Sequence, residues 1–191
     1  MTFLTRYRLP DLTKKTKGLN SLMALLCQAP ENTCTPRRQS YWSKKENRSE
    51  YHLTDTQNFN ICHINNEKEY VKFVEDASVP HADHIFLTCK DVADQKKLAI
   101  IVELKGKDVE HGYEQIAATI KTMKTHLESY LVVARIVPTK TPKATQNARS
   151  RDMMIRLLKA QAQKVGVKVP VNTLYNNLYK ESLTKLYKIF E

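Results

Sequence analysis

The feature that most restricts the fold of this chain is a sudden change of hydrophobic period after residue 102. LAIIV, residues 98–102, is five apolar residues in succession, which is typical of a central strand buried on both faces. Glu103 and Lys105 follow at once, and then a glycine. From Asp108 onward, apolar residues recur at helical spacing, and Asp108 stands where an N-cap would. The sequence therefore predicts a buried strand that ends in an acid and a base and leads directly into a helix.

The segments on either side of this unit also have strand-like patterns. ADHIFLTC, residues 82–89, precedes it across a polar turn, so an antiparallel hairpin is the simplest connection. SYLVVARIV, residues 129–137, follows the helix, and two strands joined by a helix in one sheet form a parallel pair with a right-handed crossover. Together these patterns predict an α/β domain with a mixed central β-sheet flanked by helices.

The remaining segments are assigned from the same periodicities. We expect a single domain made of a basic N-terminal arm (1–48), a core (49–137) and a basic C-terminal helical part (138–191). The further elements expected are a helix near 19–26, a basic loop at 35–50, strands at 58–64 and 69–76, a helix at 147–164, a short strand at 167–171 and a final helix at 173–190.

Charge is distributed unevenly along the 191 residues. The net charge is +11, with +7 in residues 1–48, −5 in residues 49–128 and +9 in residues 129–191. Basic flanks suit a polyanion, because each neutralised phosphate releases condensed counterions. The plainer alternative is that these cations only keep the surface solvated. An acidic centre between basic flanks favours nucleic acid as the partner.

No membrane span or export signal is expected. The chain has no run of 18 apolar residues, which a spanning helix would need. Its first residues, MTFLTRYRLPDLTKK, carry charges where a signal peptide needs an apolar core. We therefore expect a soluble, cytoplasmic protein, associated with the nucleoid if its partner is DNA.

The acid and the base at the strand end are the candidate site. Residues two apart in a strand project from the same face, so Glu103 and Lys105 should lie side by side. Asp83 starts the neighbouring strand across the hairpin, so two adjacent strands each offer one carboxylate. Such a pair suits Mg²⁺, which prefers oxygen ligands and takes few of them from protein. The alternative is an ordinary salt bridge at a strand edge.

This pattern resembles the PD-(D/E)XK nuclease superfamily, whose members share a restriction-endonuclease-like fold. The resemblance lies in Asp83, then 19 residues, then Glu103-Leu104-Lys105, with an apolar strand at each acid and a helix and a strand after them. It covers roughly residues 70–137. The motif is short, so the match is informative only because these strands and this helix surround it.

The resemblance implies a catalytic set and a cofactor. Asp83 and Glu103 correspond to metal ligands, with the backbone carbonyl of Leu104 as a third. The metal would be Mg²⁺, with Mn²⁺ as a substitute. Lys105 corresponds to the lysine that orients the attacking water or stabilises the developing charge. Gln115 corresponds to a glutamine on the following helix that faces the site in many members.

Two departures from the family pattern are visible. Ala82, not proline, precedes Asp83, and this looser form is widespread in the superfamily. Thr119 stands four residues after Gln115, where the exonuclease variant of the family has tyrosine, so that variant is not supported. The implied activity is a Mg²⁺-dependent DNA endonuclease of low sequence specificity or directed by a partner, in phage defence, mobile-element biology or DNA repair.

Basic residues around and after this unit are the expected DNA contacts. They are Lys107, Arg135, Lys140, Lys143, Arg149, Arg151, Arg156 and Lys159. Contacts of this kind hold the phosphate backbone and carry no sequence information. The sequence leaves open a homodimer or a targeting protein partner. It also leaves open two rival functions, a catalytically silent nucleic-acid-binding module of the same fold and a subunit of a larger nucleoprotein complex.

Overall fold

The structure is a computed structural model of the whole chain. It describes residues 33–36, 41–46, 48–66, 78–90, 95–140, 148–168 and 172–191. The expected helix near 19–26, the expected strand at 69–76 and Lys143 lie outside these residues.

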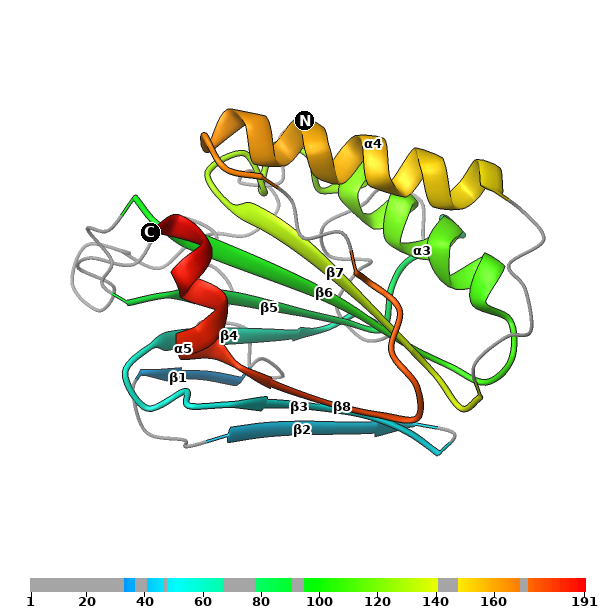
Figure 1. Cartoon of the computed structure of the whole chain (residues 1–191), viewed down its shortest axis with the longest axis horizontal. Helices are drawn as coiled ribbons and strands as arrows, with labels where there is room; N and C mark the ends of the chain where they lie inside the picture. Colours follow the sequence, from blue (N-terminus) through cyan, green and yellow to red (C-terminus); the bar gives the residue numbers. More distant parts are fainter. Residues whose placement is uncertain are drawn as a thin grey trace, which may run out of the picture.

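A five-stranded mixed sheet forms the centre of the molecule, as the sequence predicts (Figure 1). Its strands, in spatial order, are β1 (Thr33–Pro36), β4 (Asn60–Asn65), β5 (His84–Cys89), β6 (Lys97–Lys105) and β7 (Leu131–Pro138). All neighbours pair antiparallel except β6 and β7, which are parallel. The predicted hairpin and the predicted parallel pair are both confirmed.

Two helices cover one face of this sheet (Figure 1). Helix α3 (Val109–Thr122) connects β6 to β7, and Asp108 caps it by accepting a hydrogen bond from the His111 amide at 3.0 Å. Helix α4 (Ala148–Lys164) packs against α3 and β7. Within the described ranges, each helix is too short or too polar to cross a lipid bilayer.

A second, three-stranded sheet covers the opposite face (Figure 1). It has the order β2 (Tyr41–Glu46), β3 (Ser49–Thr54) and β8 (Leu178–Ser182), with β2–β3 antiparallel and β3–β8 parallel. The chain ends in a short helix α5 (Leu183–Leu186) and a 3₁₀ turn (Tyr187–Phe190). The first and last thirds of the sequence thus contribute strands to one sheet.

The hydrophobic core divides into two clusters, one on each face of the five-stranded sheet. On β6, Ala99 and Ile101 pack with the helix layer, whereas Ile100 and Val102 pack with the second sheet. This alternation follows from the period of two along a strand. Every residue from 98 to 104 is buried, so the prediction of a strand covered on both faces is confirmed.

The predicted basic loop at 35–50 is wrong. Residues 41–46 and 49–54 form the β2–β3 hairpin, in which Glu46 lies opposite Ser49. Arg48 in the connection has a φ of 71°, the left-handed conformation that a two-residue hairpin turn requires. The lysines that indicated a loop lie on β2, an outer strand of the three-stranded sheet, where Lys45 is exposed and Lys44 is half-buried. The core side of the hairpin comes from β3, in which Ser49, Tyr51 and Leu53 are buried.

The predicted final helix at 173–190 is wrong over most of its length. Residues 173–177 run beside β7: the Ile136 amide donates to the Thr173 carbonyl at 2.7 Å, and the Tyr175 amide to the Ile136 carbonyl at 2.9 Å. The chain then becomes β8, and only its last residues are helical. Of the short strand expected at 167–171, Val167 and Lys168 are not in a strand, and the rest lies outside the described residues.

Candidate metal centre at the ends of strands β5 and β6

Glu103 is a fully buried acid near the end of β6. Its side chain is 0% exposed and faces helix α3. The helix comes this close because it carries Gly112 at the crossing, where a Cβ atom would meet Lys105 Cγ at 3.3 Å and Glu103 Cγ at 3.5 Å. The apolar strand before Glu103 therefore delivers a carboxylate into the gap between sheet and helix.

Lys105 lies beside this carboxylate, as the two-residue spacing predicts. Its Nζ is 2.6 Å from Glu103 Oε1, and its side chain is 18% exposed. This is a close ion pair between a buried carboxylate and a partly exposed ammonium. A carboxylate oxygen has more than one lone pair, so Oε1 can accept a second cation beside the ammonium.

Asp83 completes the group from the neighbouring strand. The register places His84 opposite Val102, which brings Asp83 level with Glu103. The Asp83 amide donates to Glu103 Oε2 at 3.0 Å, and Asp83 Oδ2 accepts from the Leu104 amide at 2.7 Å. Asp83 and the Glu103–Leu104 segment are thus held together by one hydrogen bond in each direction.

The two carboxylates of Asp83 and Glu103 face a single cation, Lys105, within this group. Burial, and then the Asp83 carboxylate, raise the pKa of Glu103 to about 8, although Lys105 and the Asp83 amide pull it down. Burial and a like charge both disfavour the ionised form of an acid. In this environment Glu103 needs a further cation to stay ionised near neutral pH.

The residues present fit a hard divalent cation with few protein ligands. Among the described residues no group of three or more His, Cys, Asp or Glu side chains is placed to hold a metal ion, so a site must rest on two carboxylates and backbone oxygen. The Leu104 amide points to Asp83, and in a strand the amide and carbonyl of one residue face the same side. Asp83, Glu103 and the Leu104 carbonyl therefore lie together where β5 begins and β6 ends. Such a set of oxygen ligands suits Mg²⁺.

Gln115 reaches the same region, although it does not contact either carboxylate. Its Nε2 donates to the carbonyl of His81 at 2.8 Å, and its Oε1 is buried without a hydrogen-bond partner. The structure places Gln115 against the backbone that carries Asp83, and its hydrogen bond is with that backbone.

The predicted DNA-contacting cations separate into three groups. Lys107 and Lys140 are exposed beside the site, because Thr139 bonds both the Lys105 and Gly106 carbonyls and ties the two strand ends together. Arg135 is removed from the set: it is 2% exposed, and its guanidinium binds the Glu181 carboxylate at 2.6 and 3.0 Å. A buried, paired arginine does not reach a polyanion.

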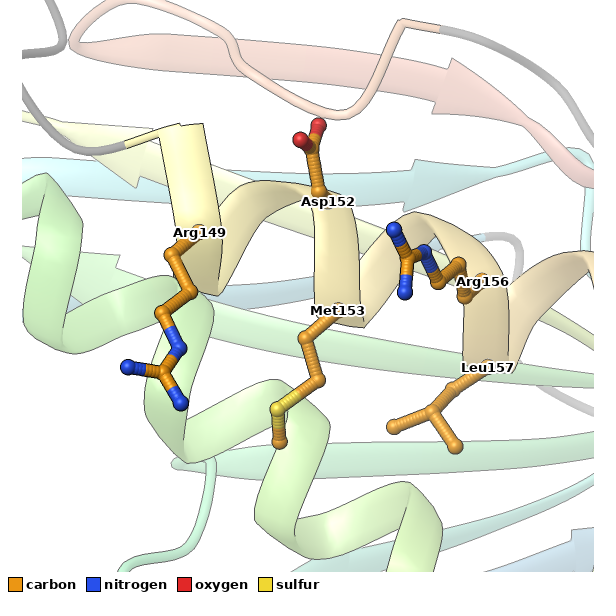
Figure 2. Close-up of a pocket in the computed structure, with 5 residues that line it drawn as sticks. All are labelled: Arg149, Asp152, Met153, Arg156 and Leu157. Atoms are coloured by element: carbon orange, nitrogen blue, oxygen red, sulfur yellow. The ribbon is translucent and has the colours of Figure 1, made fainter.

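The third group lies on α4. Its members, all exposed, are Arg149, Arg151, Arg156 and Lys159. A shallow hollow of about 390 Å³ is lined by Arg149, Asp152, Met153, Arg156 and Leu157. Figure 2 shows Arg149, Met153 and Leu157 on one side of the helix and Asp152 on the other. The start of α4 lies at the end of the molecule where β6 and β7 finish (Figure 1).

A histidine pair, buried His63 and half-buried His84, lies next to the site on the opposite face of the sheet. His63 Nε2 is 3.3 Å from His84 Nδ1. Burial, with smaller contributions from Lys44 and His84, lowers the pKa of His63 to about 2. Burial and Lys44 lower that of His84 to about 4. Both rings are therefore neutral in the folded protein at neutral pH.

This pair predicts acid sensitivity. The folded pKa values lie below the unfolded value of 6.5, so the stabilisation is complete above pH 6.5 and is lost as the pH falls toward 4. Each histidine should lower the free energy of unfolding by about 1.4 kcal/mol per pH unit in that window. Urea unfolding at several pH values measures the slope. We expect a shallower slope for His63→Asn and an unchanged one for the exposed control His111→Asn; equal slopes in all three would contradict the assignment.

Three residues of the site were missed by sequence reasoning. Gly112 lets α3 approach Glu103, Thr119 accepts a hydrogen bond from the Ala82 amide at 2.8 Å, and Asn66 Nδ2 donates to the Ala82 carbonyl at 2.6 Å. The glycine inside the predicted helix was an available signal. Glycine in a helix costs about 0.5–1 kcal/mol relative to alanine, so its presence there indicates a close contact that a larger side chain would prevent. Thr119 and Asn66 gave no comparable signal.

Comparison with known proteins finds no matching family model, no matching curated protein and no matching solved structure. The functional argument therefore depends on the geometry of the site.

Proposed function

We propose that this protein is a Mg²⁺-dependent deoxyribonuclease of the PD-(D/E)XK type, which hydrolyses phosphodiester bonds and accepts Mn²⁺ in place of Mg²⁺. The observation that carries the proposal is the convergence of Asp83, Glu103 and Lys105 at one edge of the sheet. A buried acid whose pKa is raised beside a second acid is typical of functional sites.

The order of elements around the site supports the same proposal. A β5–β6 hairpin carries the two acids, α3 follows directly, and β7 returns parallel to β6. The short Asp and Glu-x-Lys motif is informative only when these strands and this helix surround it. A restriction-endonuclease-like core is thus part of the proposal.

The roles follow from position and charge. Asp83, Glu103 and the Leu104 carbonyl would hold the metal ion, which supplies an activated water and neutralises charge on the scissile phosphate. Lys105 is partly exposed at the same edge, so its ammonium can approach the phosphate and stabilise negative charge that develops in the transition state. Water adds to phosphorus, the P–O bond to the leaving oxygen breaks, and that oxygen takes up a proton.

The exposed cations at this end would hold the DNA backbone. Lys107 and Lys140 flank the strand ends, and Arg149 and Arg151 lie in the first turn of α4. Arg156 and Lys159 lie further along α4, away from the end at which this helix begins. We therefore expect the first four to contribute more to binding at the site than the last two.

A matched pair of double variants tests this expectation. Lys107→Ala/Lys140→Ala and Arg156→Ala/Lys159→Ala each remove two positive charges. The first should reduce the salt dependence of duplex binding, d log K/d log[salt], by about 2, because two phosphate contacts are lost. Fluorescence anisotropy over a salt series measures it. Equal losses in both variants would show that only total charge matters, and a larger loss in the second would place the DNA on the middle of α4.

The decisive experiment is cleavage of supercoiled plasmid and single-stranded DNA by purified protein with Mg²⁺, Mn²⁺ or EDTA. We expect cleavage that requires metal and falls about a hundred- to a thousandfold in Lys105→Ala. Lys121→Ala, an exposed lysine on α3, is the matched control and should cleave normally. A wild-type protein that cleaves nothing with either metal contradicts the proposal.

One observation favours the rival reading, a nucleic-acid-binding module that cuts nothing. Glu103 is fully buried and in contact with Lys105, and a purely structural ion pair could look the same. Salt-sensitive DNA binding without cleavage, together with equal behaviour of wild type and Lys105→Ala, would support that reading.

A further inference from the structure

The backbone immediately before β5 is held by side chains of helix α3 and of Asn66, the residue that follows β4. This segment, residues 81–83, precedes the strand and carries Asp83. The Gln115 amide donates to the His81 carbonyl at 2.8 Å. The Ala82 amide donates to Thr119 Oγ1 at 2.8 Å, and the Ala82 carbonyl accepts from Asn66 Nδ2 at 2.6 Å.

Asp83 itself is bonded at both of its backbone groups. Its amide donates to Glu103 Oε2 at 3.0 Å, and its carbonyl accepts from the Asn66 amide at 2.9 Å. From the carbonyl of His81 to the carbonyl of Asp83, every backbone donor and acceptor therefore has a partner from α3, β6 or Asn66. Ala82 is 0% exposed, so its amide and carbonyl depend on these protein partners, which fix the path of the segment.

Thr119 has the most specific place in this arrangement. Its hydroxyl accepts from the Ala82 amide and donates to the Gln115 carbonyl one helical turn earlier, at 2.8 Å in each case. Thr119 and Ala82 are both 0% exposed, so no water replaces the hydroxyl if it is lost. A buried amide without a partner is costly, and the backbone would shift to find one.

We propose that Thr119 is a positioning residue for Asp83, which fixes the Asp83 carboxylate for metal binding by holding the Ala82 amide against α3. The inference rests on the proposed function, because it assigns a second layer of contacts to the same site. Groups that orient a ligand residue typically change metal affinity about 10- to 100-fold when they are lost. Helix α3 would then serve the site through Thr119 and Gln115 without touching the metal.

Three substitutions on α3 separate positioning from general stability. Thr119→Val keeps the shape and removes the hydroxyl, whereas Thr119→Ser keeps it. Thr122→Val is the matched control, because the Thr122 hydroxyl makes the same kind of bond to the carbonyl four residues earlier, at 2.9 Å, on the exposed side of the helix. Any general effect of removing a threonine hydroxyl from α3 should appear in the control as well.

Two measurements provide the readout, and neither requires catalysis. Amide hydrogen exchange of Ala82 in the metal-free protein should be at least about tenfold faster in Thr119→Val. Calorimetric titration with Mn²⁺ should show an affinity about 10- to 100-fold weaker in that variant. Thr119→Ser and Thr122→Val should resemble the wild type in both measurements. If Thr119→Val does not fold, Gln115→Leu removes the bond to the His81 carbonyl and should weaken Mn²⁺ binding in the same direction.

The outcomes distinguish this inference from the proposed function. If the wild type binds Mn²⁺ and Thr119→Val binds it equally well, the positioning role is wrong and the nuclease proposal is unaffected. If Thr122→Val weakens Mn²⁺ binding as much as Thr119→Val, the effect is one of helix stability and the inference is also wrong. If the wild type binds no Mn²⁺ and cuts no DNA, the proposed function fails and the positioning role fails with it.

Discussion

A Glu103→Gln protein should lose metal-dependent DNA cleavage by about a thousandfold or more, yet unfold less readily than the wild type in the absence of metal. The amide keeps the shape of the side chain, so packing against Gly112 is preserved. It removes a buried negative charge that Asp83 disfavours. At pH 8 we expect a gain of about 1 to 3 kcal/mol in the free energy of unfolding.

This combination separates a functional site from a structural salt bridge. Cleavage assays and urea unfolding of the same preparations, with and without Mg²⁺, measure both effects. Mg²⁺ should stabilise the wild type and not the variant, because only a ligand that binds the folded state raises stability. Glu114→Gln, a half-exposed acid on α3, is the control and should change neither quantity. A Glu103→Gln protein that is clearly less stable and still cleaves DNA would assign Glu103 a structural role.

Arg135→Met should destabilise the protein by about 3 to 5 kcal/mol, the largest stability loss that we expect from a single substitution here. Arg135 projects from the middle of β7, and its Nη2 lies 2.6 Å from Glu181 Oε1 on β8. Tyr51 on β3 donates to Glu181 Oε2 at 2.9 Å. Without the guanidinium, the buried Glu181 carboxylate would lose the cation that neutralises it and keep the Tyr51 hydroxyl, which cannot replace that charge.

Two comparisons test this explanation by urea unfolding. Arg135→Met/Glu181→Leu removes both charges and should recover most of the lost stability, since an apolar pair tolerates burial. Lys164→Met breaks a more exposed ion pair with Glu128, of 3.2 Å, and should cost at most about 1 kcal/mol. A double variant that is less stable than Arg135→Met alone would contradict this explanation. It would show that Glu181 stabilises the fold even without the guanidinium.

The central sheet and its helices could be predicted because their patterns are long and unambiguous. LAIIV is apolar at every position, so it cannot be an amphipathic strand at the surface. The switch to helical spacing after Asp108 places α3 directly after this strand in the sequence. The site followed from the same patterns. Once 82–89 and 98–105 form a hairpin, Asp83 lies at the same end of the sheet as Glu103, and Lys105 shares the face of Glu103. The structure adds the register, which brings Asp83 level with Glu103.

The parts that could not be predicted depend on pairings between distant segments. LYKES and the residues before it have helical spacing as well as strand propensity, and the choice between them was made by β3 and β7, which lie far away in sequence. Arg135 looked like a surface cation because no local pattern reveals that Glu181, 46 residues later, neutralises it in the interior.

The sequence by itself determined which strand would carry an acid and a base and which neighbouring strand would offer a second acid, because strand periodicity and the pairing of consecutive strands set those positions locally. Only the tertiary structure decided how the acids are held. Asn66, Thr119 and Gly112 come from elements that local periodicity places in a strand or a helix without saying what they touch. Their roles arise from the close packing of α3 and β4 around residues 81–83, where each buried backbone group must find a partner.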